Sequence, residues 1–344
     1  MTEVPLFADL IEGKPATVAR AVSIVENGRP GFEALLSRLH SRLGRARRIG
    51  ITGPPGAGKS TLTERLVRAF LDQGNKVGVI ALDPTSPFSG GALLGDRIRM
   101  ESVALDPGVY IRSMATRGSL GGLATSTREV CDILDGAGFD RIIIETVGVG
   151  QLELDVTHMA DTTALALVPE SGDGIQALKS GVIEAADLLV VNKADRPGAE
   201  KVRVALDLAL DLRLGKVAGQ MSAHHGALRS GPRPAPEEAD GRLWRPPVLL
   251  TTAVHGEGIT ELVAALDRHW AWMLGTGELE VRRRARLRLR TREIVDRAMG
   301  RWVWQESNAE ELISARLDDV TAGVTSPYEV AAEVIAVLKE GARL

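Results

Sequence analysis

Apolar residues recur along this chain with two different spacings. Short, mostly apolar runs are typical of buried strands, and apolar positions three or four residues apart are typical of helices. From Ile49 to Val254 the two patterns alternate. The predicted strands are residues 49–52, 77–82, 109–112, 141–145, 163–168, 187–191 and 248–252. This alternation predicts an α/β fold, with a mostly parallel sheet and helices on both faces.

Helical patterns flank this core on both sides. Residues 1–45 are predicted to form an N-terminal helical extension, with helices over 17–25 and 32–43. The core is predicted to cover residues 46–256, interrupted near 220–247 by a surface insertion rich in Ser, Gly, Pro and charge.

A C-terminal helical region is predicted over residues 257–344. Two long helices are expected over 259–274 and 278–304. A third begins at Ser326, with Pro327 in the first turn and Glu329 three residues after the cap. Four of the five tryptophans fall in this region, which favours an interface over simple packing against the core.

Composition limits the possible partners. The net charge is −3 and the apolar fraction 44%, so nothing in bulk favours nucleic acid or a membrane. The run from Arg282 to Arg290 is read as a solvated helix face in preference to a nucleic-acid stripe. The single cysteine, Cys131, indicates a reducing compartment, and neither a signal peptide nor a membrane span is apparent. We therefore expect a cytoplasmic protein.

A glycine-rich loop separates the first predicted strand from a predicted helix. It fits the Walker A pattern, in which the glycines let backbone N–H groups cradle phosphate oxygens at a helix N-terminus. We expect Lys59 to reach the β and γ phosphates and act in catalysis, and the Ser60 hydroxyl to coordinate Mg²⁺. The predicted phosphate-binding residues are Gly53, Pro54, Pro55, Gly56, Ala57, Gly58, Lys59, Ser60 and Thr61.

A second motif predicts which base is bound. Asn192-Lys193-Ala194-Asp195 follows a predicted strand. The Asp195 carboxylate can accept hydrogen bonds from N1–H and the exocyclic amine of guanine, a pair of donors that adenine does not offer. Lys193 would lie along the base, and Asn192 would tie this loop to the phosphate loop. Backbone N–H groups after the last strand would contact guanine O6; these belong to Thr252, Ala253 and Val254.

Carboxylates follow other predicted strands at the same edge of the sheet. Mg²⁺ keeps several waters and uses few protein ligands, so Asp83, Asp96 and Glu145 are predicted to lie near the metal and its water shell. Glu145 is also a predicted catalytic group. The Gly148 N–H is predicted to bind the γ-phosphate and to move when that phosphate leaves.

Together these motifs resemble a known family. Glu145-x-x-Gly148, with Glu where most GTPases carry Asp, is similar to the G3E group of P-loop GTPases, which serve metallocentre and cobalamin enzymes. With Asp83-Pro84-Thr85-Ser86-Pro87 and the two nucleotide motifs, the chain resembles the MeaB/ArgK branch from about residue 15 onward. The nickel- and zinc-handling branches use Cys or His clusters, whereas this chain has one cysteine and one adjacent histidine pair, His224-His225.

The resemblance implies a GTPase chaperone that gates adenosylcobalamin loading and protects or reactivates an acyl-CoA mutase. The implied partner is methylmalonyl-CoA mutase or a related adenosylcobalamin-dependent mutase, and an adenosyltransferase is left open as a second partner. It also implies Mg²⁺, GTP and GDP as ligands, and a homodimer formed through the C-terminal helices. Cobalamin itself is not expected to bind this chain, because no Asp-x-His-x-x-Gly motif is present.

The resemblance further implies that residues 169–179 form a mobile switch toward the mutase. Its glycines and charged residues fit such a role, although a plain connection remains the alternative. The residues expected to couple to the partner are Glu170, Asp173, Gln176 and Lys179.

One departure from the general GTPase pattern concerns rate. Val149 stands where many small GTPases place a water-orienting Gln, and Gln151 comes three residues after Gly148. Intrinsic hydrolysis is therefore expected to be slow and stimulated by a partner. Two other functions remain open: a kinase that transfers the γ-phosphate to an acceptor, and an adaptor whose shape is set by GTP without hydrolysis.

Overall fold

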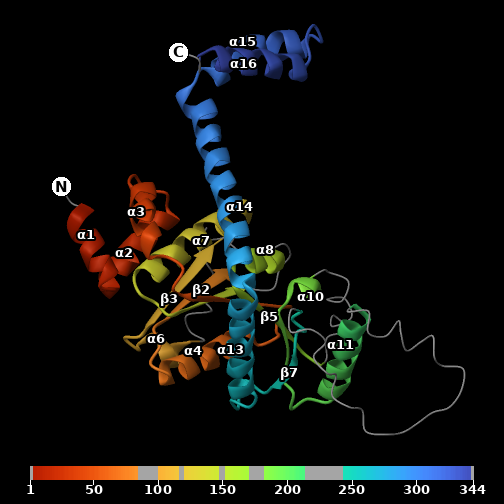
Figure 1. The fold of residues 1–344 in the computed structure, drawn as a ribbon. Helices are drawn as coiled ribbons and strands as arrows, with labels where there is room; N and C mark the ends of the chain where they lie inside the picture. The colour runs from red at the N-terminus through yellow and green to blue at the C-terminus, as the bar shows by residue number, and fades with distance from the viewer. Residues whose placement is uncertain are drawn as a thin grey trace, which may run out of the picture. The chain divides into compact units, whose positions relative to one another are not determined.

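Helices surround one parallel sheet in the computed structural model, which describes residues 3–83, 100–115, 120–146, 152–169, 182–213 and 243–341 (Figure 1). The strands are β1 (Arg47–Thr52), β2 (Val77–Asp83), β3 (Val109–Ala115), β4 (Arg141–Thr146), β5 (Thr162–Leu167), β6 (Leu188–Asn192) and β7 (Val248–Thr251). Among the described residues before α14, the α-helices are α1 (Glu3–Ile11), α2 (Pro15–Glu26), α3 (Phe32–Leu39), α4 (Lys59–Asp72), α6 (Glu101–Ala104), α7 (Leu120–Gly136), α8 (Leu152–Met159), α10 (Val182–Ala185), α11 (Ala199–Arg213) and α13 (Ile259–Thr276).

The described sheet has seven strands in the order β3-β2-β4-β1-β5-β6-β7, and every pairing is parallel. Each predicted strand is present within a few residues of its expected bounds, and the α/β fold class is confirmed. Because the strands all run the same way, their carboxyl ends lie together at one end of the sheet. We call this end the carboxyl edge; ligands bind there in open α/β sheets.

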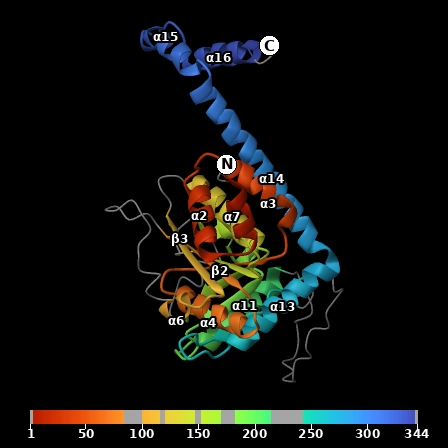
Figure 2. The same cartoon turned by 90° about the vertical axis from the view of Figure 1, so that its left-hand side faces the viewer.

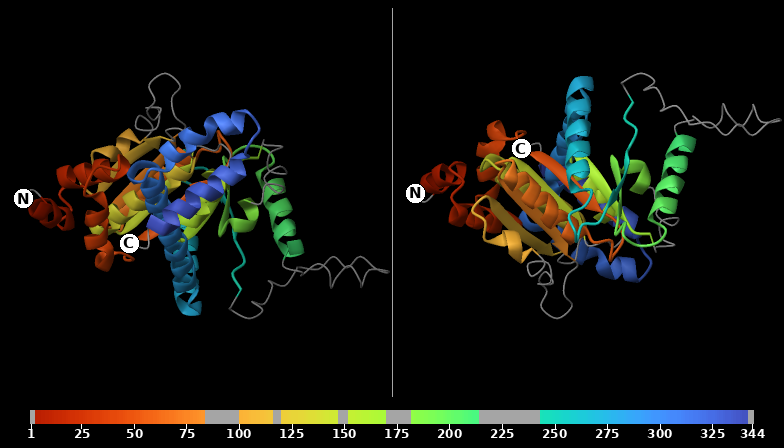
Figure 3. Two further views of the ribbon diagram at one scale, coloured as in Figure 1. Left: turned by 90° about the horizontal axis from the view of Figure 1, so that it is seen from above. Right: turned by 90° about the horizontal axis from the view of Figure 1, so that it is seen from below.

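The two faces of the sheet are covered by different helices, as the alternation of side chains along a strand requires. On one face α4 packs on β1, β2 and β4, and α13 packs on β5 and β7 (Figure 3). Leu62, Leu66 and Leu262 of these helices belong to one buried cluster. On the other face α7 and α8 cover β4, and α11 covers the edge formed by β6 and β7. The central strands are therefore apolar on both faces, which explains their continuous apolar runs.

The N-terminal helices belong to the same compact unit as the sheet. Figure 2 shows α2 beside α7, and Val18 and Val22 of α2 share a buried cluster with Val130 and Leu134 of α7. By contacts the chain divides inside α14 (Glu278–Arg301), into residues 1–283 and 284–344. The first unit thus includes α13, because that helix packs directly on the sheet. The boundaries of the core predicted at residues 46 and 256 remain predictions from the sequence.

The second unit contains the rest of α14, a π-helical turn at Trp302–Glu306, α15 (Ala309–Thr321) and α16 (Pro327–Gly341). Ala309, Val330 and Val334 form its small buried core. The cap predicted for α16 is present: Ser326 Oγ accepts from Glu329 N at 3.3 Å, and Glu329 Oε2 accepts from Ser326 N at 2.8 Å. No helix in the described ranges is long and apolar enough to cross a membrane.

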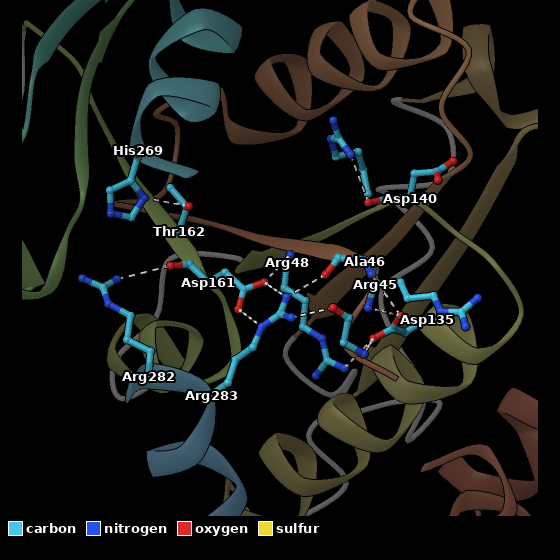
Figure 4. Close-up of polar contacts among 12 residues, drawn as sticks. Arg45, Ala46, Arg48, Asp135, Asp140, Asp161, Thr162, His269, Arg282 and Arg283 are labelled. Carbon is cyan, nitrogen blue, oxygen red and sulfur yellow. Dashed lines mark hydrogen bonds and ion pairs between the residues drawn. The ribbon is translucent and has the colours of Figure 1, made fainter. Parts of the chain in front are cut away.

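Aspartates hold the amino ends of the strands together (Figure 4). Asp135 accepts the N–H groups of three consecutive residues before β1, Gly44 at 2.7 Å, Arg45 at 3.2 Å and Ala46 at 3.0 Å. Asp161, directly before β5, accepts from Arg48 N at 3.0 Å and from both Nε and Nη2 of Arg283 at 3.2 and 3.0 Å. The backbone before β1, the start of β5 and the start of α14 are therefore joined by buried carboxylates.

Asp187, directly before β6, also binds backbone and arginine donors with its carboxylate. Its carboxylate accepts from Thr163 N at 2.8 Å, lies 3.3 Å from His269 Nε2, and accepts from Arg282 Nη1 at 2.9 Å. Burial alone would raise the pKa of this carboxyl. The hydrogen bond and charge of His269, the charge of Arg282 and the Thr163 N–H outweigh burial and hold the pKa below its ordinary value. Asp187 is therefore an ionised member of a buried polar network.

These contacts correct one expectation for the C-terminal region. Arg282 and Arg283 are not part of a solvated helix face, because they neutralise the buried carboxylates of Asp187 and Asp161. Trp270 and Trp272 are half-buried in the first unit, and the interface expected from the tryptophans stays a prediction. Trp272 stacks on His269, and the Arg47 guanidinium lies over the Trp270 ring.

We predict that Arg283→Met lowers the free energy of unfolding by about 3 kcal/mol. The variant leaves the Asp161 carboxylate buried without the charge and the two hydrogen bonds that Arg283 supplies. Urea unfolding measures this loss. Arg288→Met is the matched control, since Arg288 is an exposed arginine farther along α14. Equal stability of the two variants would show that the ion pair with Asp161 contributes little.

Candidate nucleotide site

The glycine loop follows β1 directly and passes into α4, in the order that the sequence predicted. Gly53 has a φ of +135°, and a Cβ there would lie 2.0 Å from the Ala166 carbonyl oxygen of β5. Gly58 has a φ of +81°, and a Cβ there would lie 2.4 Å from Asn192 Nδ2. These two glycines are thus required both by backbone conformation and by the close approach of neighbouring segments.

Lys59 is the first residue of α4 and is buried at the loop. Its ammonium donates to the Gly53 carbonyl at 2.7 Å and to the Pro54 carbonyl at 2.9 Å. The charge is thereby held over the loop, beside the positive end of the helix dipole. This arrangement suits the recognition of phosphate.

Ser60 and Glu145 come together from α4 and β4. The Ser60 hydroxyl donates to Glu145 Oε1 at 2.7 Å, and the two residues are 8% and 4% exposed. A hydroxyl and a carboxylate are the hard oxygen ligands that Mg²⁺ prefers, so this pair fits the predicted metal. Ser60 follows Lys59 directly in α4, so the proposed metal ligand and the proposed phosphate-binding ammonium are neighbours in sequence.

The other predicted metal ligands are only partly described. Asp83 is the last residue of β2, two positions beyond Ala81, which pairs with Glu145 in the sheet. Asp83 thus lies on the strand beside that of Glu145, two residues nearer to the carboxyl end. Asp96 lies outside the described residues, as do Gly148, Val149 and Gln151. Within the described ranges no group of three or more His, Cys, Asp or Glu side chains forms a metal site.

Asn192 joins the two nucleotide motifs. From the end of β6 its Nδ2 donates to the Ala57 carbonyl of the glycine loop at 2.8 Å. Its Oδ1 accepts from Thr251 Oγ1 and from Ala253 N, both at 3.1 Å. One buried amide therefore connects the phosphate loop, β6 and the loop after β7.

The rest of the second motif lies at the same edge of the sheet. Lys193 has a φ of +57°, the only positive φ of a non-glycine residue in the described chain, and this costs about 1 kcal/mol. The turn continues with Arg196 N donating to the Lys193 carbonyl at 3.0 Å. Asp195 is exposed, as a residue that contacts a ligand base would be. Thr252 and Ala253 are buried, while Val254 is 65% exposed.

The structure adds one residue that sequence reasoning missed. Arg65 of α4 donates from Nε to the Ala253 carbonyl at 2.9 Å and from Nη2 to the Val254 carbonyl. No motif includes this position, and an arginine within a helix gives no signal of its own. The coupling residues Glu170, Asp173, Gln176 and Lys179 lie outside the described residues.

Comparison with known proteins identifies the family. The sequence pattern of the family described as methylmalonyl-CoA mutase-associated GTPase MeaB matches residues 18–308. The chain belongs to the MeaB family. It is accordingly a GTPase, and the recognition of this branch from the Glu145 loop and the nucleotide motifs is confirmed.

Relatives of this MeaB-family chain span most of its length. A putative GTPase of Pyrococcus horikoshii is 41% identical and is matched over 91% of this chain and 92% of its own. The mouse protein named methylmalonic aciduria type A homolog, mitochondrial, is 36% identical, over 81% of this chain and 65% of its own. A solved structure described as an LAO/AO transport system kinase is 26% identical and has a TM-score of 0.64, with coverage of 98% and 99%.

We predict that Gly53→Ala and Gly56→Ala differ sharply in nucleotide affinity. Both glycines have positive φ, so both variants incur strain of about 1–2 kcal/mol. Only at Gly53 would the added Cβ meet a backbone atom, whereas nothing lies within 4 Å at Gly56. Fluorescent GDP titration should show the larger loss for Gly53→Ala. Similar losses would mean that the approach of Ala166 does not constrain the loop.

Proposed function

We propose that this MeaB-family GTPase acts as a chaperone that gates adenosylcobalamin loading and protects or reactivates a mutase. The partner is methylmalonyl-CoA mutase or a related adenosylcobalamin-dependent acyl-CoA mutase. The observation that carries the proposal is the match of residues 18–308 to a family described as mutase-associated. The name of the mouse relative, which refers to methylmalonic aciduria, supports the same metabolic context.

The nucleotide chemistry of the proposal rests on residues at the carboxyl edge of the sheet. Lys59 would bind the β and γ phosphates, while Ser60 and Glu145 would hold Mg²⁺ and its water shell, with Asp83 and Asp96 nearby. The metal would neutralise charge that develops on the phosphates. Asp195 would select guanine by accepting two hydrogen bonds. Cobalamin would remain with the partner enzymes and not bind this chain.

Communication with the mutase would pass through segments next to the γ-phosphate. Gly148 would respond to the phosphate, and residues 169–179 would form a further switch that contacts the mutase. The working form would be a cytoplasmic homodimer that meets through the C-terminal helices, and an adenosyltransferase would be a second partner. Exposed apolar residues of the second unit support such a contact, among them Trp304, Leu317 and Tyr328.

A kinase is the second candidate function. It is favoured by the description of the 26% identical structure as a transport system kinase. A kinase and a GTPase would share the phosphate loop and differ in the acceptor, a protein or small molecule in one case and water in the other.

The expected result that separates these functions is partner-stimulated release of phosphate. The purified chain is incubated with GTP and Mg²⁺, alone and with an adenosylcobalamin-dependent acyl-CoA mutase, and free phosphate is measured. A rise on addition of the mutase supports the chaperone. Phosphate found on an acceptor instead indicates the kinase, and binding without turnover indicates an adaptor that does not hydrolyse GTP.

The switch proposal for residues 169–179 has its own test. We predict that Lys179→Ala leaves intrinsic hydrolysis largely intact and removes most of the acceleration by the mutase, because the segment would act only in the complex. Lys59→Ala is the contrasting variant, which should lower both rates. If Lys179→Ala lowers both rates by the same factor, the residue belongs to the core machinery and the segment is not a separate switch.

A further inference from the structure

The loop after β7 carries the backbone donors expected to meet guanine, and most of them already have acceptors. Thr252 N donates to the Glu257 carbonyl at 3.0 Å, and Ala253 N to Asn192 Oδ1 at 3.1 Å. His255 N donates to the Thr252 carbonyl at 2.9 Å. Among the described residues no acceptor faces the N–H of Val254, so this group is the donor that the loop can offer to a base.

Arg65 holds the peptide that carries this donor. Its Nε donates to the Ala253 carbonyl at 2.9 Å and its Nη2 to the Val254 carbonyl, so one guanidinium spans two successive peptides. A peptide unit is planar and trans, so the Ala253 carbonyl and the Val254 N–H point in opposite directions. Fixing the Ala253 carbonyl from the side of α4 therefore fixes the direction of the Val254 N–H.

The Ala253 residue is thus clamped from two sides. Asn192 of β6 holds its N–H, and Arg65 of α4 holds its carbonyl. Asn192 also binds the glycine loop at Ala57, and α4 begins at Lys59 as that loop ends. The contacts close a ring through the phosphate loop, its helix and the base loop, which keeps the base donor in a fixed position relative to the phosphate site.

We propose that Arg65 is a positioning residue for base selection, and that it aims the Val254 N–H at the oxygen on C6 of guanine. Adenine carries an amino group at that position, so a fixed N–H donor meets another donor and rejects it. This proposal rests on the proposed guanine site and assigns to Arg65 a role in specificity that is distinct from that of Asp195.

The test separates the two edges of the base. Affinities for GDP, 6-thio-GDP and IDP are measured at pH 7 for the wild type and for Arg65→Ala. In 6-thio-GDP the C6 oxygen is replaced by sulfur, a weaker acceptor, whereas IDP lacks the exocyclic amine that Asp195 would read. We expect Arg65→Ala to weaken GDP binding about fivefold to tenfold and to bring the GDP to 6-thio-GDP ratio close to one. The GDP to IDP ratio should keep its wild-type value.

Arg68→Ala is the matched control on the same helix. Arg68 is exposed, bonds to Ser102 and does not touch the base loop, so both ratios should be unchanged. A wild-type GDP to 6-thio-GDP ratio in Arg65→Ala overturns the proposal. If Arg65→Ala does not fold, the same ratio measured for Arg65→Met, which keeps a long apolar stem but has no donor for either carbonyl, decides in its place. Equal binding of ADP and GDP by the wild type would instead contradict the proposed guanine site.

Discussion

The common direction of the strands governs where the polar groups that the sheet itself carries can lie. Helices cover both faces of the sheet, so these groups gather where the strands begin and where they end. At the amino edge Asp135, Asp161 and Asp187 secure the entering backbone. At the carboxyl edge lie Lys59, Glu145 and the base motif. The charged groups that stabilise the fold are thereby separated by the length of a strand from those proposed to bind the nucleotide.

At the carboxyl ends of the strands, the buried side-chain amide of Asn192 joins segments that are distant in sequence. Asn192 bonds to residues 135 positions earlier and 61 positions later, so the phosphate loop and the base loop share one support. Because its donor and acceptor atoms are both used, a substitution that keeps the size but loses either function leaves a buried partner unsatisfied. The residues proposed to recognise the phosphates and the base are thus joined through one side chain.

Much of this arrangement is legible in the sequence, because its signals are local. The seven strands are apolar runs, the glycine loop and Asn192-to-Asp195 are contiguous motifs, and the cap at Ser326 lies within four residues. The contacts of Arg65, Arg282 and Arg283 could not be predicted in this way. Each joins an arginine of an ordinary helix to a group between 95 and 189 residues away, and such pairings are set by the tertiary fold alone. The same holds for Trp270, because the Arg47 guanidinium that lies over its ring comes from β1.

The position of these arginines bears on how the chain folds as it is synthesised. Asp161 and Asp187 are made long before Arg282 and Arg283, 122 and 95 residues earlier for the paired atoms. A nascent chain that already has all seven strands still holds two carboxylates at the amino edge whose arginine partners have not been made. Completion of the sheet is therefore coupled to the emergence of the first turns of α14. Until then the nucleotide-binding unit would favour partly folded states, which are the species most exposed to aggregation and to chaperones.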